Sequence, residues 1–224
     1  MHKILRYLVQ LGENNNYEWF DQNRGLFTEI QSIFACEVKN IMNEMATADP
    51  RLAGIPVKPC IQRIQRDARF VKQMDNPFRL GMTASFSPNG KAGLHAGYSI
   101  HLEPGHKSYV AGGIVVPSST LNKKVRNYIN SHMLEYDDII NDPEFKEAFP
   151  TIGTERLLRY PSGFNEDSLA APYVMTRDFV VISRIHDREF SKKGWQSMLA
   201  ERMRLMMPFV RFTEAAIDGP AQLG

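Results

Sequence analysis

Residues 60–70 read Cys60-Ile61-Gln62-Arg63-Ile64-Gln65-Arg66-Asp67-Ala68-Arg69-Phe70, and the same polar character continues to Arg79. Two isoleucines in a short extended pattern predict a β-strand that begins at Cys60. Arginines fall on both faces of that strand, and a buried guanidinium needs carboxylates, carbonyls or an anionic ligand around it. This stretch is therefore the start of a predicted sheet and also a candidate polar site.

Further strand and turn signals follow this stretch. Shorter patterns predict strands at 82–87 and 107–116, and apolar and polar residues alternate from 94 to 103. Pro-Asn-Gly and Pro-Gly-His turns separate these strands, so neighbours should pair antiparallel. Gly112-Gly113 leaves room for the close approach of another segment or marks a bulge. Residues 178–185, rich in β-branched side chains, predict one more strand.

Helical patterns flank the strands on both sides. A 3.6-residue apolar rhythm predicts helices at 3–11, from Leu26 to just before Asp49-Pro50, from Pro117 onward, within the acidic residues 134–149, and at 195–217 with a kink at Pro208. Strands in the middle and helices at both ends predict an α+β fold. We expect a single globular domain over 1–224 with a central, mainly antiparallel sheet. N-terminal helices are expected in 1–50, strands in 60–116, and helices with a short strand in 117–176. Residues 177–217 are expected to form a strand and the C-terminal helix, which packs on the sheet.

Composition limits the class of protein. The chain has 224 residues, of which 43% are hydrophobic and 23% charged, and its net charge is +2, as in ordinary globular proteins. No apolar run approaches the roughly 18 residues of a membrane helix, and no signal peptide is recognisable at the N-terminus, so we expect a cytoplasmic protein. Cys36 lies in a helical apolar pattern and is expected to be a buried free thiol.

The first candidate site consists of the charged residues of the opening stretch. Three arginines close together can hold a carboxylate or phosphate in paired hydrogen bonds. The predicted ligand-binding residues here are Arg63, Arg66, Arg69, Lys72 and Arg79, with Asp67 among them. The alternative is a structural ion-pair network, in which Asp67, Glu18 and Glu103 neutralise the arginines.

The second candidate site is the polar face of the predicted strand 94–103. Strand spacing places His101 and Glu103 side by side, so that Glu103 can orient an imidazole or exchange a proton with it. Asp67, His101 and Glu103 are therefore the candidate acid–base residues. Two histidines and a carboxylate could also bind a metal, but no spacing typical of metal ligands supports one, and no cofactor is predicted.

Four motifs occur in order along the chain. They are Asn14-Asn15-Asn16-Tyr17-Glu18-Trp19-Phe20, Arg63 to Phe70, His101-Leu102-Glu103-Pro104-Gly105, and Arg159-Tyr160-Pro161-Ser162-Gly163-Phe164. Together they resemble the domain of unknown function 2461 family of conserved hypothetical proteins. The resemblance spans most of the chain and implies one compact domain with a shared polar centre, but no substrate. Within these motifs Trp19 is either a stacking platform or a core anchor behind an asparagine cap, and Arg159 is a further candidate ligand-binding residue.

These observations lead to one preferred hypothesis and two alternatives. The preferred one is an uncharacterised protein that binds a small anionic or phosphorylated ligand in an arginine-rich pocket, with acid–base chemistry at His101 and Glu103. The first alternative is a nucleic-acid-binding or protein-interaction module that uses the basic surface of residues 51–79, where seven Lys or Arg face two Asp. The second is a purely structural polar network. Whether the protein is an enzyme and how many copies assemble stay open.

Overall fold

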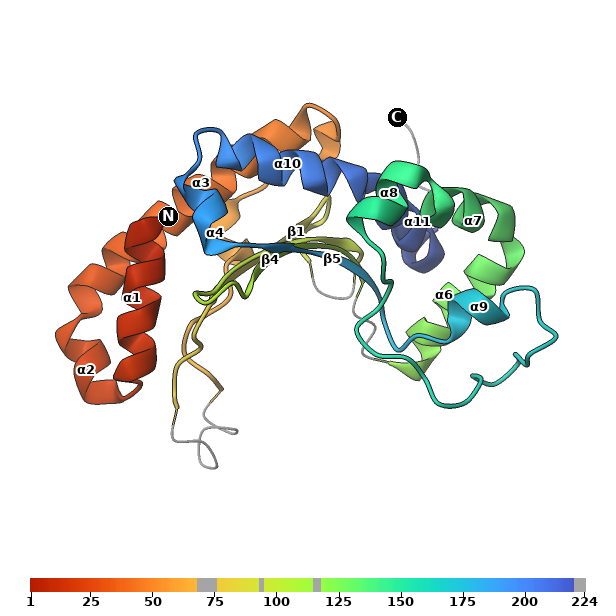
Figure 1. The fold of residues 1–224 in the computed structure, drawn as a ribbon, viewed down its shortest axis with the longest axis horizontal. Coiled ribbons are helices and arrows are strands. Elements are labelled where there is room, and N and C mark those ends of the chain that lie inside the picture. The colour runs from red at the N-terminus through yellow and green to blue at the C-terminus, as the bar shows by residue number, and fades with distance from the viewer. Residues whose placement is uncertain (68–75, 93–94, 115–117, 220–224) are drawn as a thin grey trace. The chain divides into compact units, whose positions relative to one another are not determined.

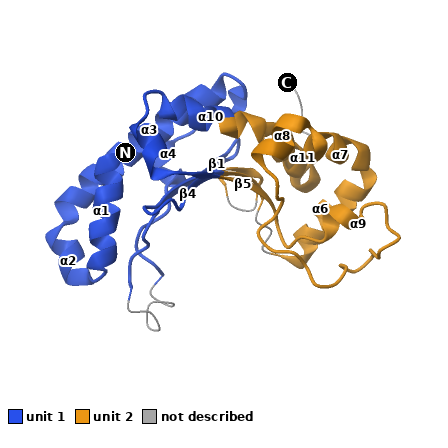
Figure 2. Cartoon of the chain, viewed as in Figure 1, with its two compact units in different colours: residues 1–91, 99–110, 184–201 blue, residues 92–98, 111–183, 202–224 orange. Residues whose placement is uncertain are grey.

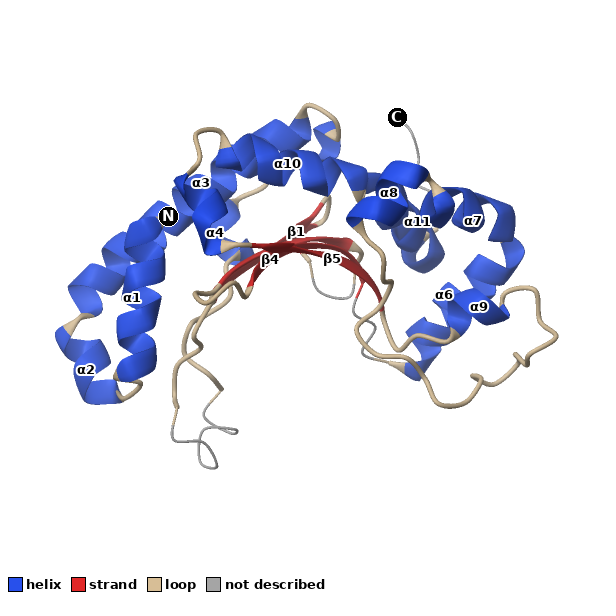
Figure 3. Ribbon diagram, in the orientation of Figure 1, coloured by secondary structure: helices blue, strands red, loops and turns tan. Residues whose placement is uncertain are grey.

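The computed structural model describes residues 1–67, 76–92, 95–114 and 118–219 of the chain (Figure 1). Its strands form one five-stranded antiparallel sheet in the order β2-β1-β3-β4-β5, with helices before and after it in the sequence (Figure 3). The strands are β1 (Met82–Ser87), β2 (Gly90–Lys91), β3 (Gly97–Leu102), β4 (Ser108–Ile114) and β5 (Phe179–Ile185). The predicted α+β fold is therefore confirmed.

The chain divides into two compact units, which are described separately (Figure 2). The first unit contains residues 1–91, 99–110 and 184–201, and the second contains residues 92–98, 111–183 and 202–224. A single globular domain over the whole chain stays a prediction.

Helices of the first unit follow the apolar patterns of the sequence. They are α1 (His2–Glu13), α2 (Tyr17–Gln22), α3 (Arg24–Ala46) and α4 (Val57–Cys60), with a 3-10 turn, η1, at Pro50–Leu52. The first residues of α10 (Trp195–Leu205) also belong to this unit and lie beside α3, because Gln196 donates a hydrogen bond to Glu37 at 3.0 Å and Ser197 donates one to Glu44 at 3.1 Å. Helix α3 buries Phe34, Val38 and Met45, as its periodicity predicted. Cys36 instead faces solvent, so its predicted burial was wrong: it lies off the stripe that those residues define.

The strand predicted at Cys60 is an extended segment rather than a regular strand. Cys60 ends α4, and in the described part of the segment after it Ile61 and Gln65 make isolated antiparallel bridges, to Ala84 and Phe78 respectively. Arg63 and Gln65 are exposed along this segment, so neither side chain is buried against a face of the sheet. The result is a pair of arms, before residue 68 and after residue 75, that run side by side (Figure 1).

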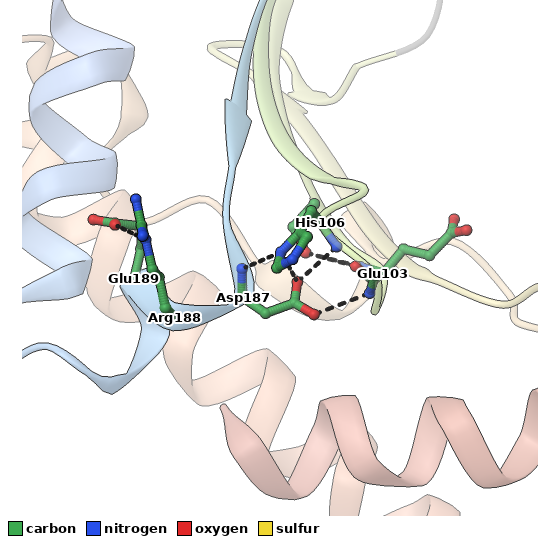
Figure 4. A network of polar contacts seen from close by, with 7 residues as sticks. Glu103, His106, Asp187, Arg188 and Glu189 are labelled. Carbon is green, nitrogen blue, oxygen red and sulfur yellow. Dashed lines mark hydrogen bonds and ion pairs between the residues drawn. The ribbon is translucent and has the colours of Figure 1, made fainter.

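The turn between β3 and β4 is fixed by a carboxylate from the segment after β5. Gly105 and His106 both have positive φ, at 79° and 64°. Asp187 accepts hydrogen bonds from the backbone N–H of Gly105 at 2.9 Å and of His106 at 3.0 Å (Figure 4). Because a non-glycine residue with positive φ is unfavourable by itself, these two bonds hold the turn in place. The predicted Pro-Gly-His turn is thus present, and it contacts the first residue of the 3-10 helix η2 (Asp187–Ser191).

The second unit consists mainly of helices. They are α6 (Ser119–Ser131), α7 (Met133–Asn141), α8 (Pro143–Ala148), α9 (Ala171–Val174) and α11 (Met207–Asp218). Its core is aromatic: Tyr136 lies 5.1 Å from Phe212, and Phe145 lies 5.9 Å from Phe209, measured between ring centroids. Pro208 produces a break rather than a kink in the predicted last helix, because it stands in the first turn of α11, where a proline costs no hydrogen bond.

Two predictions within the second unit have different outcomes. The close approach predicted at Gly112-Gly113 is confirmed, since a Cβ at Gly113 would lie 2.2 Å from the carbonyl oxygen of Phe179. The short strand predicted within 117–176 is reduced, among the described residues, to isolated bridges at Ile152 and Arg156. Proline and glycine in this part of the chain interrupt any longer hydrogen-bonded ladder.

Candidate functional site

A large groove in the first unit brings together most of the described residues of the opening stretch. Its volume is about 1300 Å³, and α3 and the two arms of the extended segment line it. Five cationic side chains and one carboxylate belong to the lining: Lys58, Arg63, Arg66, Asp67, Arg79 and Lys91. The first unit therefore presents a strongly basic groove, which we call the arginine groove.

Two of these arginines have a buried nitrogen without a partner. The Nε atoms of Arg66 and Arg79 are inaccessible to solvent, and neither makes a hydrogen bond within the described part of the chain. Their backbones are fixed: the Arg66 N–H donates to Pro77 O at 2.9 Å, and the Arg79 N–H donates to Ile64 O at 2.8 Å. The two arginines therefore stand on adjacent arms, which backbone hydrogen bonds hold together.

The second arm is held by a buried asparagine from the turn between α1 and α2. The Asn15 amide donates to Phe78 O at 3.0 Å, and its Oδ1 accepts from Phe78 N–H, also at 3.0 Å. The Phe78 ring stacks on Phe20 at 4.1 Å between centroids. Asn15 thus pairs with Phe78 as a neighbouring strand would, and this contact places Arg79 at the groove.

The other asparagines of the same motif have local roles. Asn16 is the N-cap of α2, because its Oδ1 accepts from the Trp19 N–H at 2.9 Å. The predicted asparagine cap is therefore Asn16. The Trp19 ring lies 5.7 Å from Tyr7 and is half-buried, which agrees with the alternative that Trp19 is a core anchor. Trp19 does not line the arginine groove.

Three further predicted ligand-binding residues cannot be assigned to the arginine groove. Arg69 and Lys72 are outside the described residues. Arg159 belongs to the second unit and is exposed there. Of the predicted set, Arg63, Arg66, Asp67 and Arg79 are therefore the ones that the structure places around one groove.

His101 and Glu103 form a second polar cluster on a half-buried face of the sheet. The Nε2 atom of His101 lies 3.0 Å from Glu103 Oε2, so the predicted side-by-side placement is confirmed. Neither residue lines the arginine groove. The structure thus separates into two clusters what the sequence combined into one polar centre.

Several residues around these clusters escaped the sequence analysis. Thr28, Gln31 and Ser32 of α3 line the arginine groove, and Lys91 of β2 adds a cation. The spacing of 28, 31 and 32 on one side of a helix is the signal that could have revealed them. On the sheet, Thr83 and Tyr109 contact His101, and only the pairing of strands brings them there.

Tyr109, which stacks on His101 in the sheet cluster, has a raised pKa. Burial raises the pKa of Tyr109, the positive charge of Arg184 lowers it, and the negative charge of Glu103 raises it further. The phenol is therefore neutral at physiological pH. Among the described residues, no group of three or more His, Cys, Asp or Glu side chains has an arrangement that could hold a metal ion.

The fold and the two clusters define an α+β protein with a basic groove beside its sheet. Within the described residues, no helix combines the length and the apolar character needed to cross a membrane. The chain belongs to the family of conserved hypothetical proteins called DUF2461, whose model matches residues 3–212, and the resemblance seen in the sequence is thereby confirmed. No curated protein and no solved structure matches it.

Proposed function

We propose that the protein binds a small anionic or phosphorylated ligand in the arginine groove. The observation that carries this proposal is the pair of buried Nε atoms, on Arg66 and Arg79, without a hydrogen-bond partner in the described chain. A hydrogen bond to a charged group contributes about 1.5–3 kcal/mol, and a buried donor without one carries a desolvation cost of similar size. An anion bound through the other N–H donors of the two guanidinium groups would offset that cost at both arginines.

The other lining residues indicate the chemistry of the ligand. The Gln31 and Gln62 amides can donate hydrogen bonds to a phosphate. The hydroxyls of Thr28 and Ser32 already donate to Arg24 O and Thr28 O within α3, so they can only accept hydrogen bonds from hydroxyl groups of a ligand. A volume of about 1300 Å³ exceeds that of a single phosphate. A larger ligand, such as a sugar phosphate or a tricarboxylic acid, therefore fits better than a lone phosphate ion.

A thermal-shift experiment tests this proposal. Pyrophosphate, glucose 6-phosphate and citrate are compared with sodium chloride at equal ionic strength, on the wild type and on Arg66→Gln, Arg79→Gln and the control Arg6→Gln. Arg6 is an exposed arginine of α1 that does not line the groove, so its substitution removes the same charge. A ligand at a hundred times its dissociation constant stabilises the folded state by about 2.7 kcal/mol, which raises the melting temperature by roughly 5–11 °C in a chain of this size.

The expected result is a shift in the wild type and in Arg6→Gln that both groove variants lose. Equal shifts in all four proteins, or no shift with any of the three probes, would contradict the proposal. If Arg66→Gln and Arg79→Gln unfold without any probe present, the arginines are structural, as the alternative of a polar network requires.

The nucleic-acid alternative is separated from this proposal by salt dependence. Lys58 and Arg63 are exposed at the groove, as a surface that follows the phosphate backbone of a nucleic acid requires. Affinity for double-stranded DNA would then fall steeply between 50 and about 200 mM salt, because several phosphate contacts release counterions. Absence of retention on heparin at low salt would leave the small-ligand proposal as the one supported.

A further inference from the structure

A half-buried face of the sheet carries a hydroxyl, an imidazole and a carboxylate in one hydrogen-bonded line. Thr83 Oγ1 lies 2.8 Å from His101 Nδ1, and His101 Nε2 lies 3.0 Å from Glu103 Oε2. Thr83 belongs to β1 and His101 to the neighbouring strand β3, so the line crosses the sheet. All three residues lie in the first unit, and each of the three is partly accessible to solvent.

The imidazole is held in this orientation from both sides. A Cβ at residue 81 would lie 2.5 Å from His101 Cε1, so only the glycine found there leaves room for the ring. On its other side, the Tyr109 ring stacks on His101 with centroids 4.7 Å apart. The Arg184 guanidinium in turn lies 6.0 Å from the Tyr109 ring centroid. Packing as well as hydrogen bonding therefore fixes the histidine.

The two ring nitrogens have different partners, and this decides what the histidine can do. When Nε2–H donates to the Glu103 carboxylate, Nδ1 carries a lone pair and accepts from the Thr83 hydroxyl. A base that is hydrogen-bonded to a hydroxyl and oriented by a carboxylate is the arrangement that activates hydroxyl nucleophiles. Lys107, 3.3 Å from Glu103 Oε1, supplies a positive charge beside that carboxylate.

We propose that Thr83, His101 and Glu103 form a nucleophilic triad that transfers an acyl group from a carboxylic ester. The Thr83 oxygen attacks the ester carbonyl while its proton moves to His101 Nδ1, and the alcohol leaves with that proton. Water then attacks the acyl-threonine, again losing a proton to His101, and the carboxylic acid and free Thr83 are released. The step needs no cofactor. It is independent of anion binding, because none of the three residues lines the arginine groove.

A second hydroxyl on the same strand provides a matched control. Ser85 lies two residues after Thr83 on β1, and its Oγ is 2.8 Å from Ser99 Oγ rather than from a histidine. Ser85 thus has similar exposure and the same strand environment, without a base. An unactivated threonine hydroxyl is secondary and reacts more slowly than a serine hydroxyl, so higher reactivity at Thr83 than at Ser85 would come from His101.

The test uses a fluorophosphonate ester, which reports an activated hydroxyl by forming an oxygen–phosphorus bond and releasing fluoride. The full-length protein is treated with the probe, and the adduct is located by peptide mass spectrometry. The variants are Thr83→Val, Thr83→Ser, His101→Gln and Ser85→Ala, each checked by circular dichroism. Hydrolysis of p-nitrophenyl acetate, with its burst of nitrophenol, then tests acyl transfer itself.

An adduct on Thr83 of the wild type is the expected result, retained in Thr83→Ser and Ser85→Ala and absent from Thr83→Val. Loss of the general base should slow labelling in His101→Gln by about 100-fold or more. The proposal is overturned if the wild type forms no adduct, if peptide mapping finds the adduct elsewhere, or if folded Thr83→Val and the wild type hydrolyse the ester at equal rates. Because mapping is done on the wild type, the result does not depend on any variant folding.

Discussion

Replacing Asn15 with alanine should destabilise the first unit more than the same replacement of Asn14 or Asn16. Asn15 is only 9% exposed, and Phe78 is 1% exposed, so water does not readily replace their contacts. The substitution removes two hydrogen bonds of 3.0 Å and leaves the N–H and C=O of Phe78 without partners. A buried donor or acceptor that is left unpaired costs about 1–3 kcal/mol, so two such groups at about 1.5 kcal/mol each give an expected loss of about 3 kcal/mol.

The neighbouring asparagines provide internal controls of the same size and chemistry. Asn16→Ala removes the cap of α2 and should cost about 1 kcal/mol. Asn14→Ala removes an exposed bond from Asn14 Nδ2 to Gln10 O and should cost less than about 0.5 kcal/mol. The expected order of destabilisation is therefore Asn15, then Asn16, then Asn14.

Urea unfolding followed by tryptophan fluorescence measures this order. Both tryptophans, Trp19 and Trp195, belong to the first unit, so the signal reports on the part of the chain that Asn15 holds together. In thermal unfolding of the same variants, a loss of about 3 kcal/mol lowers the melting temperature of a chain of this size by roughly 6–12 °C. Equal stability of Asn15→Ala and Asn14→Ala would refute the idea that Asn15 is the link that holds the second arm.

Two further substitutions test the packing of the first unit. Gly81→Ala places a methyl group against the His101 imidazole, and overpacking of this kind should cost about 1–3 kcal/mol in thermal melting, whereas Gly25→Ala, with open space around the added Cβ, should not destabilise. Burial raises the pKa of Tyr7 to about 12, and its hydroxyl has no partner among the described residues. The neutral phenol is thus favoured in the folded state, so stability should be constant below pH 10 and fall as the pH rises from 10 to 12. Tyr7→Phe should reduce that alkaline loss, part of which remains because the pKa of Tyr109 is also raised, without lowering stability at pH 7. A drop at pH 7 would show that the hydroxyl is satisfied.

Local patterns in the sequence determined the secondary structure. The long helix α3, the strands β1 and β5 and the turn at Gly105 follow from periodicity, β-branched residues and glycine, because these signals act over a few residues. The side-by-side placement of His101 and Glu103 was predictable for the same reason, as both stand on one strand.

Tertiary structure alone decided which polar residues meet. Asn15 pairs with Phe78 across 63 positions of sequence, and Thr83 reaches His101 across 18, so no local pattern could reveal either contact. The arginines of the opening stretch were visible in the sequence, but whether carboxylates neutralise them depends on chain segments far apart. In the described structure Arg66 and Arg79 meet in one groove with unpaired nitrogens, while His101 and Glu103 lie in a separate cluster. The physical reason is that side-chain chemistry is encoded residue by residue, whereas proximity results from the packing of the whole chain.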